Sequence, residues 1–264
     1  MVSTCPTLPD GLHRLALADG RAAVAKIRRG APDGFFAAEA RGLEALRATR
    51  TIRVVAIHEA AADGLVLEDL GAGHARDEDW TRAGARLAAL HRSRGPAFGF
   101  DADGWCGDGA QDNRWHDDGH AFFAERRLRA QAERAATSGR LGADDLRRVE
   151  RIAATLADRV PPMPPVLIHG DLWLGNLHAC ANGELALIDG GAVHYGWAEA
   201  ELAMLTLFGE PPPRFFAAYA AEAGIDASWR ERASLYNLYH LLNHLNLFGA
   251  GYLGAVRRAL DRWA

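Results

Sequence analysis

The polar loop over residues 169–176 contains the residue types that phosphoryl transfer needs. It reads His169-Gly170-Asp171-Leu172-Trp173-Leu174-Gly175-Asn176, and Asp189 follows thirteen residues after Asn176. An aspartate, an asparagine five residues later and a second aspartate after the next strand are typical of a kinase site, where a base faces the acceptor and two oxygen ligands hold magnesium. We therefore predict that Asp171 is the catalytic base and that Asn176 and Asp189 are metal ligands.

Lys26 is the only lysine among the thirty residues that are Lys or Arg. A lysine near the end of a strand, followed by a glutamate in the next helix, is the pair that holds the phosphates of ATP in kinases. We predict that Lys26 binds the α- and β-phosphates and that Glu39 positions it. The alternative is an ordinary surface ion pair, because both residues would gain a role only through their position.

Further residues are expected around this cluster. The segment Glu68-Asp69-Leu70 ends a strand pattern and leads into glycines, so we interpret it as a connection between lobes that also binds the nucleotide. Trp173 could form a wall of a sugar site or anchor the loop. We also place His169 and Glu199 near the acceptor.

Strand patterns occupy the first part of the chain. Residues 12–17 and 22–27 read as two strands joined by a tight turn at Asp19-Gly20, because Asp-Gly suits positive φ. Apolar spacing predicts a helix over 35–48, and 52–58 with 65–67 predict another strand pair. One later hairpin, formed by 166–169, 177–179 and 185–188, carries the polar loop. Helices are expected over 80–91, 120–138, 144–158, 199–208, 213–223 and 229–248.

This order of elements predicts an α+β protein with a protein-kinase-like, two-lobed fold. A small β-rich N-terminal lobe, shortened relative to other kinases, would span residues 1–70 and bind the nucleotide. A larger, mainly helical lobe would span residues 71–264 and hold the catalytic and substrate-binding groups.

Composition excludes several classes of protein. A net charge of -4 and a pI near 6.3 argue against a nucleic-acid-binding protein, which normally presents a basic face. No apolar run approaches the roughly 20 residues that span a bilayer, and the N-terminus has no signal-like pattern. We expect a cytoplasmic protein whose partners are small molecules, with no nucleic acid and no membrane. No pattern assigns an oligomeric state.

The cysteines and histidines show little metal-site spacing. Cys5, Cys106 and Cys180 lie far apart, which favours free thiols over a disulfide framework or a metal knuckle. His240 and His244 stand four residues apart in an apolar helix pattern. We interpret this pair as packing or a substrate wall, with a metal site as the alternative.

The polar loop and its surroundings resemble the fructosamine kinases, also called ketosamine-3-kinases, within the aminoglycoside phosphotransferase and choline kinase superfamily. The loop is similar to the family's HGDLWxGN signature, whose tryptophan distinguishes it from the broader superfamily. The resemblance implies an ATP- and magnesium-dependent kinase that phosphorylates the third carbon of a ketosamine, such as a ribulosamine or fructosamine, in the removal of sugars from glycated amines. It covers nearly the whole chain, with similar segments over 36–43, 87–92, 98–100, 111–115, 122–128 and 199–209.

Two departures from the family pattern set further expectations. Only residues 1–11 precede the segment that matches the family at 12–17, where relatives have a further strand and a glycine-rich loop. Fewer backbone N–H groups over the phosphates would weaken ATP binding. After Asp189 the chain reads Gly190-Gly191, whereas the family commonly has a proline, and this puts the geometry of the carboxylate in question.

Two alternatives therefore stay open. An aminoglycoside or choline-type kinase would need an acidic pocket for a cationic acceptor, to which Asp117, Asp118, Glu199 and Glu201 could contribute. A degenerate kinase with weak or no activity would follow from the shortened loop.

Overall fold

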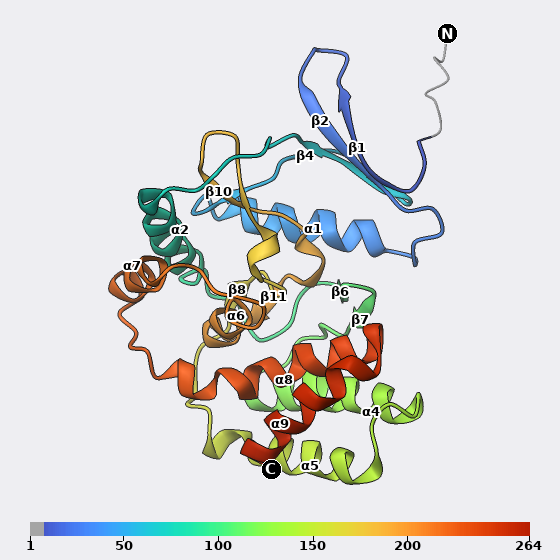
Figure 1. Cartoon of the computed structure of the whole chain (residues 1–264), viewed down its shortest axis with the longest axis vertical. Coiled ribbons are helices and arrows are strands. Elements are labelled where there is room, and N and C mark those ends of the chain that lie inside the picture. Colours follow the sequence, from blue (N-terminus) through green and yellow to red (C-terminus); the bar gives the residue numbers. More distant parts are fainter. Residues whose placement is uncertain (1–7) are drawn as a thin grey trace.

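The computed structural model of the chain describes residues 8–264, so Cys5 and the first residues of the expected nucleotide lobe lie outside the described residues. Figure 1 shows strands β1, β2 and β4 above helix α1 at one end of the molecule. Helices α4, α5, α8 and α9 gather at the opposite end, where the chain terminates. The predicted division into a strand-rich part and a helical part is confirmed.

The N-terminal sheet has four antiparallel strands in the order β1-β2-β5-β4. Strands β1 (Gly11–Ala16) and β2 (Ala22–Ile27) form the predicted hairpin. Its turn contains Gly20 at φ 85°, a conformation that glycine adopts without a steric penalty. The predicted hairpin and its turn residue are therefore confirmed.

The prediction of one continuous strand over 52–58 is wrong. The segment splits into β3 (Arg53–Val54) and β4 (Ile57–Ala61), and only β4 pairs with β5 (Gly64–Glu68). Strand β3 instead pairs in parallel with β10 (Leu185–Leu187), and the Val55 amide also donates to the Leu187 carbonyl at 3.0 Å. Residues 53–55 thus form their backbone hydrogen bonds in one sheet, and residues 57–61 form theirs in another.

The helical predictions are largely confirmed, and α1 (Phe35–Ala48), α7 (Pro213–Ala223) and α8 (Trp229–Phe248) have the expected bounds. The helix expected over 199–208 ends earlier, at Met204, and α9 at the C-terminus was not predicted. The remaining helices are α2 (Asp77–Leu90), α3 (Gly119–Phe122), a π-helical segment (Phe123–Arg129), α4 (Ala130–Thr137), α5 (Ala143–Ala154), α6 (Ala198–Met204) and α9 (Leu253–Trp263).

Short strands between these helices frame the polar loop. Strands β9 (Leu177–Ala179) and β10 form the expected hairpin, but β8 (Val166–Ile168) pairs with β11 (His194–Gly196) rather than with β9. A second hairpin joins β6 (Gly104–Cys106) to β7 (Gly109–Gln111). The prediction of a single hairpin in this region is therefore wrong.

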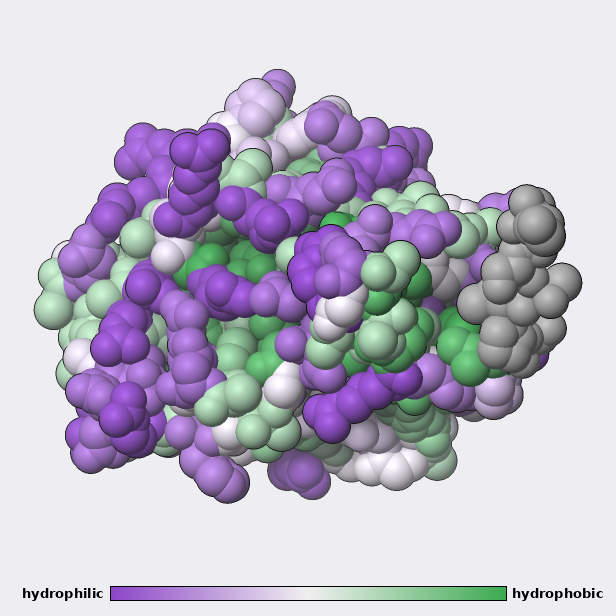
Figure 2. All heavy atoms as spheres, turned by 90° about the horizontal axis from the view of Figure 1, so that it is seen from above, coloured by the Kyte–Doolittle hydropathy of each residue, from purple (hydrophilic) through white to green (hydrophobic). Residues whose placement is uncertain are grey.

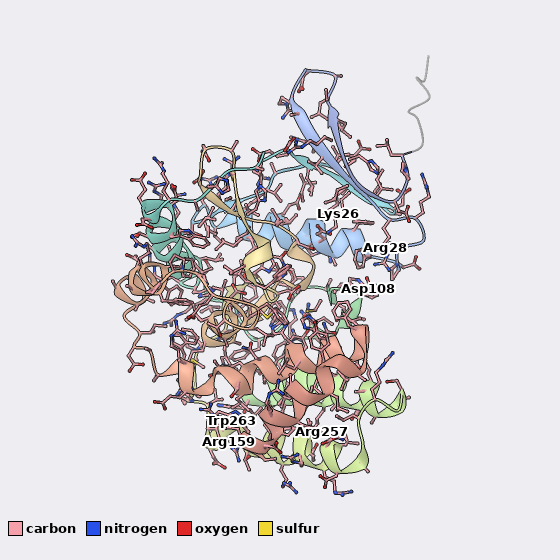
Figure 3. The ribbon with its side chains drawn as sticks, in the orientation of Figure 1. Lys26, Arg28, Asp108, Arg159, Arg257 and Trp263 are labelled. Carbon is pink, nitrogen blue, oxygen red and sulfur yellow. The ribbon has the colours of Figure 1, made fainter. Side chains whose placement is uncertain are left out.

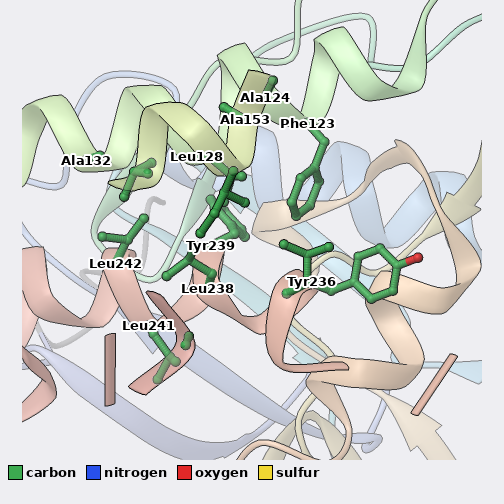
Figure 4. Packing of buried hydrophobic residues seen from close by; sticks show 14 of the residues in the cluster. Phe123, Ala124, Leu128, Ala132, Ala153, Tyr236, Leu238, Tyr239, Leu241 and Leu242 are labelled. Atoms are coloured by element: carbon green, nitrogen blue, oxygen red, sulfur yellow. The ribbon is translucent and has the colours of Figure 1, made fainter. Parts of the chain in front are cut away.

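Two hydrophobic clusters hold these elements together. One fills the helical end, where Phe123 and Leu128 of the π-helical segment pack beside Tyr236 and Leu242 of α8, as Figure 4 shows. The other runs from α1 through β5 and β10 to α2, α6 and α7. Each fully buried leucine contributes about 1.5–3 kcal/mol relative to an exposed one. The second cluster contains residues of β5 and also of the strands that flank the polar loop, so it joins the N-terminal sheet to that loop.

The face of the molecule that lies above the N-terminal sheet is mainly hydrophilic. In Figure 2, which views the molecule from above, charged and polar residues cover most of the visible face and apolar residues show between them. Among residues 8–264, none of the helices has the length and apolar character needed to span a membrane.

Candidate functional site

The predicted phosphate-binding lysine lies at the centre of a charged cluster. Lys26 Nζ is 2.9 and 2.8 Å from the two carboxylate oxygens of Glu39 and 3.2 Å from Asp189 Oδ1. Glu39 is only 2% exposed, so this pair is no ordinary surface ion pair. Burial alone would lower the pKa of Lys26, but the charges of Asp189 and Glu39 outweigh it and raise that pKa. The ammonium therefore stays charged between Asp189 and Glu39, while burial and the charge of Asp189 raise the pKa of Glu39 to about 7.

These residues line a cleft of about 780 Å³ below the N-terminal sheet. Asp171 reaches the same cleft from the polar loop. Its walls are mainly apolar, and the mouth is bridged by an ion pair between Arg28 at the end of the β2 region and Asp108 in the β6–β7 turn, both labelled in Figure 3. The apolar wall residues include Val24, Phe36, Val55, Leu67, Leu70 and Ile188.

The backbone of Asp189 is held in the left-handed conformation, at φ 65° and ψ 64°. Aspartate is one of the few residues besides glycine that adopt it readily. The next residue, Gly190, packs directly against α1, and a Cβ there would lie 2.7 Å from the Leu43 amide nitrogen. On the helix side, a Cβ on Gly42 would lie 2.0 Å from the Gly190 carbonyl oxygen. Both glycines are thus needed for the close approach of α1, the helix that also carries Glu39.

Asp171 is less hydrated than Asp189, the other carboxylate at this end of the cleft. Its side chain is 21% exposed, whereas that of Asp189 is 52% exposed. Burial raises the pKa of Asp171 to about 7, and the nearby negative charge of Asp189 adds to the rise. A group with this pKa can take and release a proton near neutral pH, as a general base requires.

The rest of the polar loop is folded tightly around Asp171. The Asn176 side-chain amide donates to the Asp171 carbonyl at 2.8 Å, which leaves its oxygen as the potential metal ligand. The Trp173 indole lies over Gly175, where a Cβ would meet the ring at 2.2 Å. Trp173 therefore anchors the loop, while its 40% exposure also lets it face solvent.

His169 is fully buried beneath the loop and does not line the cleft. Its Nε2 donates to the Ile188 carbonyl at 2.7 Å, and its Nδ1 accepts from the Asp171 amide at 3.3 Å. The backbone amides of His169 and Gly170 donate in turn to the buried carboxylate of Glu201, at 3.0 and 2.8 Å. His169 was expected near the acceptor, but in the structure its hydrogen bonds support the polar loop from below.

The connection Glu68-Asp69-Leu70 lines the cleft as expected. Its side-chain carboxylates already have protein partners, because Glu68 pairs with Arg53 and Asp69 pairs with Arg14 at 3.1 Å. Of the three side chains in this segment, that of Leu70 is the one that forms no ion pair and adds to the apolar wall of the cleft.

A second cavity, of about 330 Å³, is also lined by Asp171. Aromatic side chains form a large part of its lining, and Asp171 is the only carboxylate among its lining residues. The sequence indicated Asp171, Trp173 and His244 as candidate site residues, but it missed the others, because they come from separate parts of the chain, including the β6–β7 hairpin and α6. The lining includes Cys106, Trp173, Phe208, His244, Phe248 and Tyr252.

Glu199 lines neither cavity around Asp171. Its carboxylate is bound by Arg232 at 2.8 Å and by the Tyr236 hydroxyl at 2.6 Å. Asp118 caps α3 by accepting from two backbone amides, and Glu201 is buried beneath the polar loop. The acidic residues considered for a cationic acceptor therefore do not gather in one pocket.

Comparison with known proteins identifies the family. A family model described as fructosamine kinase matches residues 15–264. The chain belongs to the fructosamine kinase family. It is a phosphotransferase with the two-lobed, kinase-like fold of that family, and the predicted family and enzyme class are confirmed.

Relatives of this fructosamine kinase family member come from bacteria and plants. A protein of Synechocystis sp. named "Probable ketoamine kinase" is 41% identical over 232 residues, covering 86% of this chain and 78% of the relative. The chloroplastic protein-ribulosamine 3-kinase of Arabidopsis thaliana is 34% identical over 251 residues, covering 89% and 74%. A crystal structure from Thermobifida fusca, of a candidate fructosamine-3-kinase, has a TM-score of 0.87 at 36% identity and covers 95% and 89%.

Proposed function

We propose that this chain uses ATP and magnesium to phosphorylate the 3-hydroxyl of a ketosamine sugar, such as a ribulosamine or fructosamine. The observation that carries the proposal is that Asp171 lines both cavities, the apolar-walled cleft with Lys26 and the aromatic cavity with Trp173. The relatives named for ketoamine and ribulosamine kinase activity support the choice of acceptor.

The cleft would hold the nucleotide. Its apolar walls suit an adenine ring, and backbone groups of 68–70 would meet the edge of the base. Lys26, kept charged by Glu39 and Asp189, would contact the α- and β-phosphates. We accordingly propose residues 1–70 as the nucleotide lobe and 71–264 as the catalytic and substrate-binding lobe.

The oxygen groups of Asn176 and Asp189 fit magnesium, which prefers hard oxygen ligands. When bound, magnesium neutralises charge that develops on the transferred phosphoryl group. Because Asp189 also contacts Lys26, one carboxylate would align the lysine with the phosphates.

Asp171 would orient the acceptor and receive its proton. The acceptor oxygen forms a bond to the γ-phosphorus, the bond from that phosphorus to the bridging oxygen of ADP breaks, and the hydroxyl proton passes to the Asp171 carboxylate. The aromatic cavity would hold the sugar beside Asp171, with Trp173 as one wall.

The test uses four acceptors in parallel, namely a ribulosamine, a fructosamine, an aminoglycoside and choline, each with ATP and magnesium. Phosphorylated product is followed by mass spectrometry and its position is assigned by NMR. Ketosamine 3-phosphate that is absent with Asp171→Asn is the expected result. Product from the aminoglycoside or choline alone would overturn the proposed acceptor, and no product from any acceptor would overturn the kinase activity.

A further inference from the structure

Asp171 has two neighbours that phosphoryl transfer does not use. Cys106 ends strand β6, and His240 lies in α8. Cys106 Sγ is 3.9 Å from His240 Nδ1, and the same nitrogen is 3.9 Å from Asp171 Oδ1. One ligand atom from each of the three residues lies within 4.8 Å of the other two. A thiol, an imidazole and a carboxylate thus converge on one point.

We propose that Cys106, Asp171 and His240 form a binding site for one zinc ion. Sulfur, nitrogen and carboxylate oxygen are the donors that zinc takes in proteins, and three protein ligands leave a fourth position open. Neighbouring ligand atoms around a tetrahedral zinc lie about 3.3–3.6 Å apart, so side-chain movements of about 1 Å would complete the site. The aromatic cavity, which reaches Cys106 and Asp171, provides the entry path and the open position.

The ligands are held by partners of their own. The Asn243 side-chain amide of α8 donates to the Cys106 carbonyl at 3.0 Å, about one helical turn beyond His240. The Tyr239 hydroxyl donates to Gln111 Oε1 at 2.8 Å and so fixes β7 to the same helix. Because the β6–β7 hairpin is fastened to α8 on both strands, Cys106 and His240 are kept in register before any ion binds.

The donor set separates this site from the magnesium ligands. Asn176 and Asp189 offer only oxygen, which suits magnesium, whereas thiolate and imidazole favour zinc. His240 is 5% exposed, and burial lowers its pKa to about 3, so the imidazole is in the neutral form that binds metals. Burial also raises the pKa of the Cys106 thiol, so zinc must displace a proton and its affinity should increase with pH.

Zinc at this site would occupy the carboxylate that faces the acceptor hydroxyl. It should therefore inhibit competitively with the acceptor and not with ATP. This consequence rests on the proposed function, but binding of the ion does not.

The binding test uses the full chain, with cobalt(II) as a spectroscopic probe and zinc as the competing ion, in excess magnesium. Cobalt bound to a thiolate absorbs in the near ultraviolet. We expect one cobalt per chain with this absorption, and its loss when zinc is added. The double variant Cys5→Ser/Cys180→Ser should retain it, whereas Cys106→Ser should lose it and bind zinc at least tenfold more weakly.

His240→Gln supplies an independent variant that keeps the thiol, and it should also weaken zinc binding at least tenfold. Circular dichroism establishes that each variant is folded. Unchanged zinc affinity in both folded variants, or no cobalt binding by the folded parent, would overturn the zinc site. Binding by a chain that phosphorylates no acceptor would uphold the site and overturn the proposed function. Kinase activity in a chain that binds neither cobalt nor zinc would uphold the proposed function and overturn the zinc site.

Discussion

The buried carboxylate of Glu201 accepts a hydrogen bond from the backbone amide of His169 at 3.0 Å. It also accepts from Gly170 at 2.8 Å and from His91 Nε2 at 3.2 Å. Burial alone would raise the pKa of Glu201, but the hydrogen bonds and charges of His91 and His169 lower it, so the group stays ionised. Helix α6 thereby fixes the start of the loop that carries Asp171.

Glu201→Gln should reduce kcat by about tenfold to a hundredfold, because a misplacement of about 1 Å in a catalytic group has effects of this size. Glutamine offers one acceptor oxygen, so a buried donor loses its partner at a cost of about 1–3 kcal/mol. Glu199→Gln is the matched control on the same helix, since Glu199 binds Arg232 instead. Steady-state kinetics should show near-parent kcat for the control, and equal losses in both variants would contradict this role of Glu201.

The pH dependence of activity should report Asp171 together with Glu39, because burial raises the pKa of each carboxyl to about 7. Because burial raises the pKa of Asp171 to about 7, a growing fraction of the base is protonated below that pH. We expect kcat/KM for the acceptor to fall about tenfold per pH unit on the acid side, since this parameter reports groups of the enzyme form that binds the acceptor. Initial rates at saturating ATP, measured across neutral pH, provide the check. A flat profile through pH 7 would show that Asp171 is ionised well below it.

The same group should make the parent less stable as the pH rises. The pKa of Asp171 in the folded chain is about 7, above the ordinary value of 3.8, so between these values the folded state holds a proton that the unfolded state has lost. Stability therefore decreases with rising pH across that window and stays reduced above it. Asp171→Asn removes this penalty, and its Tm should exceed the parent's above pH 7 by a few degrees, with the difference shrinking near pH 4.

Asp118→Asn serves as the control for that comparison. Hydrogen bonds from the Ala121 and His120 amides lower the pKa of Asp118. This substitution should therefore give no gain in Tm at neutral pH. Thermal melts of both variants across pH supply the measurement, and a pH-independent Tm difference for Asp171→Asn would contradict the linkage.

Much of this site could be predicted from the sequence because its parts are local. The polar loop needs only eight residues, and its internal hydrogen bond from Asn176 to the Asp171 carbonyl joins two positions five residues apart. Helices α7 and α8 were predicted with the observed bounds, because helix periodicity repeats over several turns. Lys26 and Asp189 are 163 residues apart. Their meeting could be predicted only because kinases place such residues in this order along the chain.

The remaining features depend on long-range packing. Strands β8 and β11 have three residues each, too few for an alternating pattern to identify their partners. Cys106 and His240 are 134 residues apart and meet only because the β6–β7 hairpin packs on α8. Glu199 and Glu201 lie two positions apart on α6, so they point to different faces, and the sequence did not say which face meets the loop.

Lys26 should be the lysine that an ATP-derived acylating reagent modifies, since the chain has no other lysine. An acyl phosphate of ATP would deliver its acyl group to the amine beside the phosphates. Peptide mass spectrometry should find the label on Lys26, with at least tenfold protection by ATP and magnesium. A ketosamine without ATP is the control and should not protect. Equal labelling with and without ATP would argue against nucleotide binding in this cleft.

Gly42→Ala should disturb Asp189 through the backbone. The added Cβ would lie 2.0 Å from the Gly190 carbonyl oxygen, so α1 and the segment after Asp189 must separate. We expect a lower Tm and more than tenfold lower kcat, because Lys26, Glu39 and Asp189 would no longer share one alignment. Gly254→Ala is the control in a helix, where the nearest atom to the new Cβ is the flexible end of Arg258 at 3.6 Å. Its Tm should be equal or higher, because alanine favours helix by about 1 kcal/mol over glycine. Parent-like Tm and kcat for Gly42→Ala would show that the close approach of α1 is not what orients the carboxylate.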